Sequence, residues 1–363
     1  MAAGMEKNDV RYATGLVAAD PFFLLADGPR LHLLVSALEA ARARKTCPAA
    51  RLHTPAELFP GGVRPPPPGA QVLALVRKLR FRAVRVGPYF PHGIARALER
   101  GGVRVELVPG PAFPRRAVKT RREVACIAQA QRAAAAALRA AVACIRGAAV
   151  ARSGELRHAG RVLTAERVKE LIARTLQAHG CSAEDPIVAV GPQGARPHDT
   201  GTGPLRAGVP VVLDIFPRNQ ATGYWGDITR TVVRGRASAE VRRMHRAVLA
   251  AQQLALGMIR PGVAGRTIHR AVEDYFRRAG FATRLAPAGR ECGFIHGTGH
   301  GVGLDIHEAP GLRNGPGRLA AGQVVTVEPG LYYPGRGGVR IEDTVLVTRT
   351  GHKILASFPK NLE

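Results

Sequence analysis

The chain has few cysteines, and no two of them are closely spaced. Five occur among 363 residues: Cys47, Cys126, Cys144, Cys181 and Cys292. Disulfide frameworks and cysteine zinc sites both require paired or closely spaced cysteines. An odd, scattered set therefore argues against both and predicts free thiols in a reducing compartment.

Long apolar runs are also missing. No segment approaches the roughly 18–20 consecutive apolar residues that a membrane-spanning helix needs. The first fifteen residues, "MAAGMEKNDVRYATG", carry charges where a signal peptide would have its apolar stretch. We therefore expect a soluble, cytoplasmic protein that has no membrane partner.

Acidic and aromatic residues are both scarce. The chain has 27 Asp and Glu against 53 Lys and Arg, a net charge of +26, and only 5% aromatic residues. A strongly basic chain is a candidate for binding nucleic acid. However, the basic residues are spread widely, and few aromatic side chains are available to stack on bases. We expect a solvated basic surface and no nucleic-acid partner, with contact to polyanions left as the alternative.

The length of the chain favours two domains. Prolines interrupt secondary structure in "PGPAFPRR" (109–116), so we place the domains at 1–115 and 116–363. The first alternates in an α/β manner, and its proline run at 64–69 predicts a stiff connection. Its expected elements are a strand leading into a helix at 31–45, a strand at 81–87, a helix at 91–102 and a strand at 103–110.

The second domain combines strands with longer helices, as in an α+β fold. Apolar residues at three- and four-residue steps predict helices at 238–259 and 266–279, and an alanine-rich stretch predicts another at 119–146. Apolar or alternating segments predict strands at 187–191, 209–217, 228–235, 322–333 and 337–348.

One glycine-rich stretch, "HGTGHGVGLDIHE" (296–308), carries three histidines. His296 and His300 have the spacing of a helical zinc motif. Four glycines nevertheless argue against a helix, because each would cost about 1 kcal/mol there: Gly297, Gly299, Gly301 and Gly303. We expect a strand or loop whose backbone closely approaches another group.

Four acids interrupt apolar segments of the second domain: Asp214, Asp227, Glu328 and Glu342. Burying a carboxylate is unfavourable unless it is paired or bound to a metal. Any one of them could be a satisfied structural residue. Together with His300, however, they predict two divalent ions, for which an oxygen-rich ligand set favours manganese or cobalt, with zinc possible. Two such ions can ionise a shared water, which predicts a hydrolase.

Several motifs occur in the order seen in one enzyme family: "GYWGDITRTVV", "HGTGHGVGLDIHE", "TVEPGLYY" and "GGVRIED". They resemble the pita-bread-fold metallopeptidases, above all the Xaa-Pro dipeptidases (prolidases) and Xaa-Pro aminopeptidases. The segments "DVRYATGL" and "DPFFLL" are similar to the creatinase/prolidase N-terminal domain. The resemblance implies a pita-bread catalytic domain over 116–363, a small peptide substrate and a homodimer.

The resemblance also implies five metal ligands: Asp214, Asp227, His300, Glu328 and Glu342. Asp227 and Glu342 would bridge two ions, and Glu328 would also accept a proton from the water between them.

Other residues match substrate positions of the family. His307 would stabilise the tetrahedral intermediate. His198 matches an upstream substrate histidine, and His296 matches a residue of the pocket wall. Arg340 matches an arginine of the prolyl-specific members that orients the catalytic histidine or the carboxyl side of the substrate.

The chain departs from the family pattern beside the substrate. Phe216 replaces a common glycine two residues after Asp214, and "QGAR" precedes the proline before His198. These changes leave two rivals to a peptidase: a nonpeptidic hydrolase or lyase on the same metal site, and a pseudo-enzyme that only binds. The sequence does not separate a dipeptidase from an aminopeptidase. Eight further histidines are expected to be surface or packing residues: His32, His53, His92, His158, His179, His245, His269 and His352.

Overall fold

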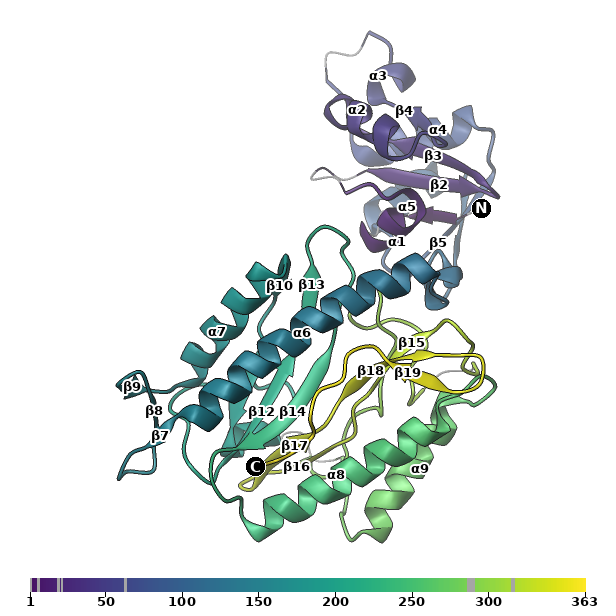
Figure 1. Ribbon diagram of the computed structural model, residues 1–363. Coiled ribbons are helices and arrows are strands. Elements are labelled where there is room, and N and C mark those ends of the chain that lie inside the picture. The colour runs from purple at the N-terminus through teal and green to yellow at the C-terminus, as the bar shows by residue number, and fades with distance from the viewer. Residues whose placement is uncertain are drawn as a thin grey trace. The chain divides into compact units, whose positions relative to one another are not determined.

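The computed structural model describes residues 2–4, 7–17, 20, 22–61, 64–285, 291–314 and 317–363. Their packing divides the chain into two compact units, residues 1–116 and 117–363 (Figure 1). The boundary lies one residue from the predicted position, and the assignment of the first unit as a creatinase/prolidase-like domain stays a prediction. Within the described ranges, no helix has both the length and the apolar character that crossing a bilayer requires.

The N-terminal unit is built on one mixed sheet with the strand order β4-β3-β2-β1-β5-β6. Its strands are β1 (Ala2–Gly4), β2 (Phe23–Asp27), β3 (Arg30–Leu34), β4 (Arg51–His53), β5 (Ala83–Val86) and β6 (Arg104–Leu107). Its helices are α1 (Lys7–Thr14), α2 (Ala37–Thr46), α3 (Pro55–Leu58), α4 (Pro68–Lys78), α5 (His92–Arg100) and the 3-10 turn η1 (Pro114–Ala117), which crosses the boundary. The predicted α/β alternation is confirmed.

The predicted stiff connection at 64–69 is wrong at its end, because α4 already begins at Pro68. Proline is tolerated in the first turn of a helix, where its missing N–H would have no partner within the helix.

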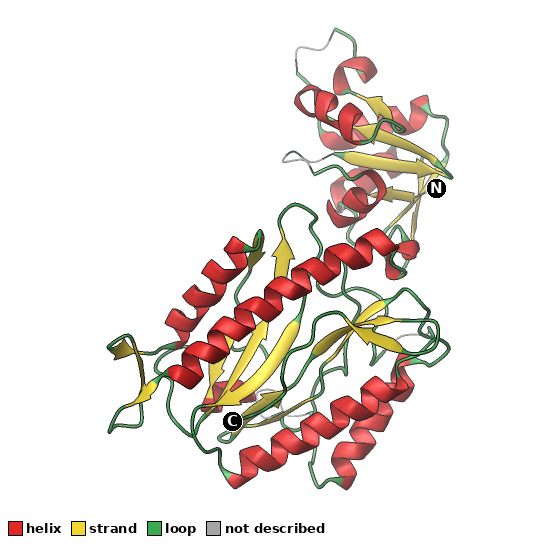
Figure 2. Ribbon diagram, in the orientation of Figure 1, coloured by secondary structure: helices red, strands yellow, loops and turns green. Residues whose placement is uncertain are grey.

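In the second unit, helices cover the strands on two sides (Figure 2): α6 and α7 lie on one side, and α8 and α9 on the other. They are α6 (Arg121–Gly147), α7 (Ala165–Ala178), α8 (Ala239–Met258) and α9 (Gly265–Arg278). The three predicted helices are confirmed to within two residues. A capping box begins α6, in which Thr120 and Glu123 bond each other's backbone N–H.

The strands of this unit form small sheets, with the orders β7-β8-β9, β10-β13, β11-β12-β14, β15-β18-β19 and β16-β17. They are β7 (Ala149–Val150), β8 (Leu156–His158), β9 (Arg161–Val162), β10 (Cys181–Ala183), β11 (Ile187–Val190), β12 (Pro210–Ile215), β13 (Pro217–Asn219), β14 (Ile228–Val233), β15 (Val324–Val327), β16 (Gly330–Tyr333), β17 (Gly337–Arg340), β18 (Asp343–Val347) and β19 (His352–Ile354). A 3-10 turn, η2 (Gly191–Ala195), follows β11.

Three predicted strands are each broken in two. The segment 209–217 splits at Phe216, between β12 and β13, while 322–333 and 337–348 split beside Glu328 and Glu342. Pro329 has no N–H to continue a ladder, and the N–H of Glu342 donates to the carbonyl of Thr229 at 3.0 Å. Periodicity within a segment did not reveal these breaks, which lie next to the predicted site residues.

Packing on both sides holds these strands. Val248 of α8 and Ile268 of α9 share one buried cluster with Val325 of β15. Leu138 of α6 shares another with Leu213 of β12. The strands that carry the site are therefore fixed by close-packed cores, which deform little.

Candidate metal centre and active site

One cavity of about 550 Å³ in the second unit collects every predicted site residue. Its lining includes Asp214, Asp227, His300, Glu328, Glu342, His198, His296, His307 and Arg340. These residues come from segments up to 144 positions apart in the sequence, from 198 to 342. Only the tertiary fold brings them together.

Strand ends position the four acids. Asp214 lies in β12 opposite Thr229 of β14. Asp227 directly precedes β14, Glu328 directly follows β15, and Glu342 lies between β17 and β18. The backbone at each strand end is anchored by its ladder, so each carboxylate projects from a rigid support.

The glycine-rich stretch 296–308 is an irregular loop, as predicted. A Cβ at Gly299 would lie 2.0 Å from the carbonyl oxygen of Thr326, so only glycine fits there. This close approach lets the N–H of His300 donate to Thr326 Oγ1 at 3.0 Å. Gly299 therefore fixes the position of His300 relative to the acids.

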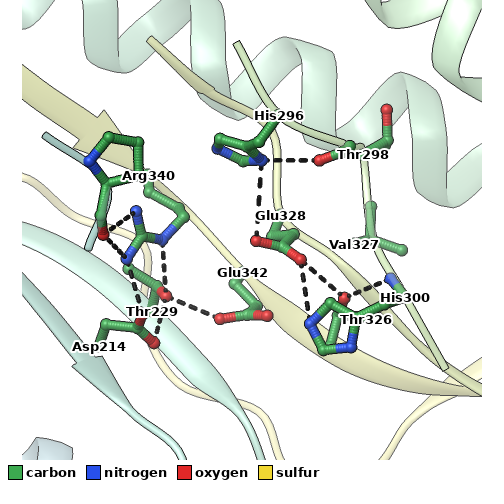
Figure 3. Close-up of polar contacts among 12 residues, drawn as sticks. Asp214, Thr229, His296, Thr298, His300, Thr326, Val327, Glu328, Arg340 and Glu342 are labelled. Atoms are coloured by element: carbon green, nitrogen blue, oxygen red, sulfur yellow. Dashed lines mark hydrogen bonds and ion pairs between the residues drawn. The ribbon is translucent and has the colours of Figure 1, made fainter. Parts of the chain in front are cut away.

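Three of the five predicted ligands converge closely. Asp227, His300 and Glu342 each offer one ligand atom, and these atoms all lie within 4.8 Å of one another. His300 Nε2 also lies 3.2 Å from Glu328 Oε1 (Figure 3). Glu342 Oε1 is buried and has no hydrogen-bond partner within the described structure. A buried carboxylate oxygen without a partner fits a cation between these groups.

The fourth acid joins the group through Thr229. The Thr229 hydroxyl lies 2.9 Å from Asp214 Oδ1 and 2.7 Å from Glu342 Oε2. Arg340 donates to Asp214 Oδ2 at 2.7 Å and to Thr229 Oγ1 at 3.2 Å. Figure 3 shows these contacts side by side. Arg340 thus holds the orientation of Asp214, and no hydrogen bond between Arg340 and His307 is found among the described residues.

The pKa values of the acids are driven apart. Burial and the charges of Glu342 and Asp214 raise the pKa of Asp227 well above its usual range. Burial and the charges of Glu328 and Asp214 raise the pKa of Glu342 to about 8. For Glu328 burial acts in the same direction, but the hydrogen bond and charge of His300 outweigh it and lower its pKa to about 2. Without a cation, the four acids do not all ionise together near neutral pH.

A chain of hydrogen bonds fixes His296. Burial lowers the pKa of His296 to about 4, so the ring is neutral. Its Nδ1 lies 2.8 Å from the carbonyl of Gly297, an acceptor, so Nδ1 carries the proton. Nε2 then accepts from the hydroxyl of Tyr332 at 2.8 Å, and that oxygen accepts from Arg340 at 2.7 Å.

His307 lies on the exposed side of the cluster. Its ring packs edge-on against that of His300, with centroids 4.3 Å apart. Burial and the nearby His300 lower its pKa. Its neighbour Glu308 forms an ion pair with the buried Lys119. A Cβ at Gly303 would collide with the carboxylate of Glu308, so this glycine makes room for the pair.

The protein family of this chain follows from a match to a family model. The model of metallopeptidase family M24 matches residues 125–349, more than half of the chain and the whole segment that carries the cavity.

The chain belongs to metallopeptidase family M24.

Individual relatives agree with this family. The uncharacterized peptidase YqhT of Bacillus subtilis is 37% identical over 188 residues, covering 51% of this chain and 50% of its own length. The Xaa-Pro dipeptidase of Pyrococcus furiosus is 36% identical over 182 residues, or 50% and 49%. These alignments span about half the length of the curated relatives.

A solved structure extends the similarity to nearly the whole chain. The Xaa-Pro dipeptidase from Bacillus anthracis superposes with a TM-score of 0.83 at 27% identity, covering 99% of this chain and 94% of that one. The predicted fold, an α/β unit followed by a pita-bread unit, is confirmed.

Several residues of this M24 site were not predicted from the sequence. Thr229, Tyr332, Thr326 and Lys119 all bond predicted site residues or their neighbours, and Gln131 bonds the backbone of Asp227 at 2.7 and 2.8 Å. Hydroxyl and amide side chains are common, so composition does not single them out. The spacing of Thr229, two residues after Asp227 on an alternating strand, is the one signal that could have placed it on the same face.

Four of the eight histidines outside the motifs are buried: His32, His53, His245 and His269. His269 Nδ1 lies 2.9 Å from Thr298 Oγ1, within the glycine-rich loop. This contact agrees with the packing role expected for it.

Proposed function

We propose that this chain is a metal-dependent peptidase that releases the N-terminal residue of a dipeptide or short peptide whose second residue is proline. The observation that carries the proposal is the convergence of Asp227, His300 and Glu342 within 4.8 Å, with Asp214 and Glu328 in the same cavity. The family membership supports peptide hydrolysis. Two relatives named Xaa-Pro dipeptidase support the proline preference.

The ligand set proposed for two divalent ions is Asp214, Asp227, His300, Glu328 and Glu342. The buried, unpartnered Glu342 Oε1 and the raised pKa of Asp227 both fit cations in their midst. Four carboxylates with one imidazole favour manganese, with cobalt or zinc as alternatives. When bound, such ions would supply Lewis-acid polarisation of the scissile carbonyl and of the attacking water.

The residues of the chain have separate roles in the proposed reaction. Glu328, ionised at neutral pH, accepts one proton of the water whose oxygen adds to the scissile carbonyl carbon. It returns this proton to the proline nitrogen as the C–N bond breaks. His307, whose lowered pKa keeps its ring neutral, donates an N–H to the carbonyl oxygen as negative charge develops there. His198 and His296 line the substrate side of the cavity, and Arg340 holds Asp214 in place.

Location and assembly complete the proposal. We propose a cytoplasmic protein, since its five cysteines are all free thiols. A homodimer is proposed from the resemblance to the prolidases alone. Analytical ultracentrifugation of the purified protein measures its mass in solution, and a monomeric mass would refute the dimer.

The test is amino-acid release from Ala-Pro, Ala-Pro-Ala and Ala-Ala-Ala by protein that has been stripped of metal and reloaded with manganese. Cleavage of a proline peptide, but not of Ala-Ala-Ala, would support the proposal, and the preferred length would separate dipeptidase from aminopeptidase. If the protein holds two metal ions but cleaves none of the three, the proposal fails and a nonpeptidic reaction is favoured. Phe216, which lines the cavity in place of glycine, is the feature that favours this rival.

A further inference from the structure

Besides the ligand cluster, apolar residues line the cavity. They are Ile187, Pro197, Phe216 and Ile306. Besides the four acids of the cluster, one more carboxylate belongs to the described lining, that of Asp185. None of the roles proposed above uses it.

An irregularity in the strand places Asp185 at this position. Ala183 pairs with Pro217, and Ile187 pairs with Asp214. Three residues, 184–186, therefore face only two, 215 and 216, as in a β-bulge. Asp185 takes the left-handed conformation, with φ +47°. Few residues other than glycine adopt this conformation, and bulges beside active sites re-aim side chains. The bulge turns Asp185 toward the cavity, level with Phe216.

The Asp185 carboxylate has no partner of its own. Within the described residues it forms no hydrogen bond or ion pair, whereas Asp214 is held by Arg340. Cations are not scarce, because the chain has 53 Lys and Arg for 27 acids. The carboxylate is therefore free to meet a charged group that enters the cavity.

We propose that Asp185, Ile187 and Phe216 form a subsite for the first side chain of the substrate, selecting a long chain that ends in a cation, as in lysine or arginine. The proposal rests on the proposed function. The apolar walls would pack against the methylene stem while the charged end meets the carboxylate. Asp185 lies about two residues, roughly 7 Å, along the strand from the cluster, which suits the reach of a four-carbon stem.

The α-amino group of the substrate is not the partner of Asp185. It is separated from the scissile carbonyl by a single carbon, so it must lie beside the ligand cluster. The side chain of the first residue is the part of the substrate that extends further.

The test compares Lys-Pro with Nε-acetyl-Lys-Pro, which keeps the stem and removes the charge. In the manganese-loaded protein we expect kcat/KM to favour Lys-Pro by about fivefold, the upper range for an exposed charge pair, mainly through KM. Asp185→Asn should bring the ratio near one, and cleavage of Leu-Pro by the wild type shows that the proposed metal site is active. Glu184→Gln is the matched control, because this exposed neighbour is not among the described residues that line the cavity, and it should keep the ratio.

A second readout needs no turnover. Calorimetric binding of free lysine against Nε-acetyl-lysine to the same protein should show the same preference, and Asp185→Asn should abolish it. Equal values for the charged and acetylated forms, or a ratio unchanged in Asp185→Asn, would overturn the subsite. If the proposed function fails instead, Leu-Pro is not cleaved either. The binding comparison between free lysine and Nε-acetyl-lysine then still tests the role of Asp185.

Discussion

At the scale of single residues, the hydroxyl of Thr229 connects two acids of the candidate metal centre. It has one proton, yet it lies within hydrogen-bond distance of both Asp214 and Glu342 and also accepts from Arg340. It can donate to only one of the two acids at a time. In the metal-free protein, Glu342, whose pKa is about 8, can supply the missing proton itself.

Thr229→Val keeps the shape of the side chain and removes these bonds. Because groups that orient ligands tune metal affinity, we expect manganese to bind about 10- to 100-fold more weakly. Calorimetric titration of the metal-free protein measures this. The control is Thr231→Val on the same strand. In the described part of the chain its hydroxyl bonds only the backbone of Arg340, so this variant should leave the affinity unchanged. Equal affinities of Thr229→Val and wild type would refute the role of the hydroxyl.

Lys119, which is remote in sequence, supports the loop that carries His307. Its side chain is 1% exposed and pairs with Glu308, next to His307. Lys119→Met would remove this ion pair from the largely buried carboxylate of Glu308, and we expect the free energy of unfolding to fall by about 3 kcal/mol. Urea unfolding measures the loss, and kcat should fall as the loop loosens. Adding Glu308→Gln should recover part of the stability, and a double variant no better than Lys119→Met would speak against the pair.

The sequence points to the acids, the histidines and Arg340, but not to most of the side chains that bond them. Asp214, Asp227, Glu328 and Glu342 are conspicuous because charge interrupts apolar segments. Tyr332 and Lys119 become relevant only through tertiary contacts with residues 36 and 189 positions away, which no local pattern encodes.

At the scale of elements, helices were predicted better than strands. Three of the four long helices of the second unit, α6, α8 and α9, could be predicted to within two residues, because alanine content and an apolar stripe are local features. The fourth, α7, was not predicted. The strands break where a single residue matters: at Phe216, beside Pro329, and before Glu342, whose N–H bonds another strand. Periodicity therefore misses the strand ends next to the candidate site residues.

Two strands of the N-terminal unit bury a pair of histidines. β3 and β4 bring His32 Nδ1 to within 3.2 Å of His53 Nε2, with stacked rings. Burial lowers the pKa of both, more than the nearby acids raise it. The charged groups that face the pair are Asp27, Arg30, Arg51, Glu57 and Lys78.

The unfolded chain binds protons on these histidines at a pKa of about 6.5, and the folded chain only at lower pH. Below pH 6.5 the unfolded state therefore holds more protons, and the free energy of unfolding should fall as pH falls. Urea unfolding of the N-terminal unit at pH 7.5, 6.5 and 5.5 tests this. His53→Phe should flatten the dependence, and His92→Gln, at an exposed position, should not. An unchanged slope in His53→Phe would rule out the pair as its source.

At the scale of the whole molecule, the candidate metal centre destabilises the folded state when no cation is bound. Its acids come from strands on different segments, and their burial together with their mutual repulsion raises the pKa of Asp227 and Glu342. A cation that binds only the folded state would relieve this. At a free concentration of 100 times Kd it would add about 3 kcal/mol.

We therefore expect manganese to raise the melting temperature of the metal-free protein by roughly 6–10 °C. Scanning calorimetry with and without the ion measures the shift. Asp227→Asn should show a much smaller one, and an equal shift in this variant would place the stabilising ion elsewhere.

The central claim is that the converging acids and His300 hold two metal ions that enable hydrolysis of a prolyl peptide. Its most direct test adds manganese stepwise to the metal-free protein while following the release of alanine from Ala-Pro. We predict no release without metal, a rise that levels off at two ions per chain, and no release by Asp227→Asn at any ratio. Release by the metal-free protein, or full activity of Asp227→Asn, would contradict the account.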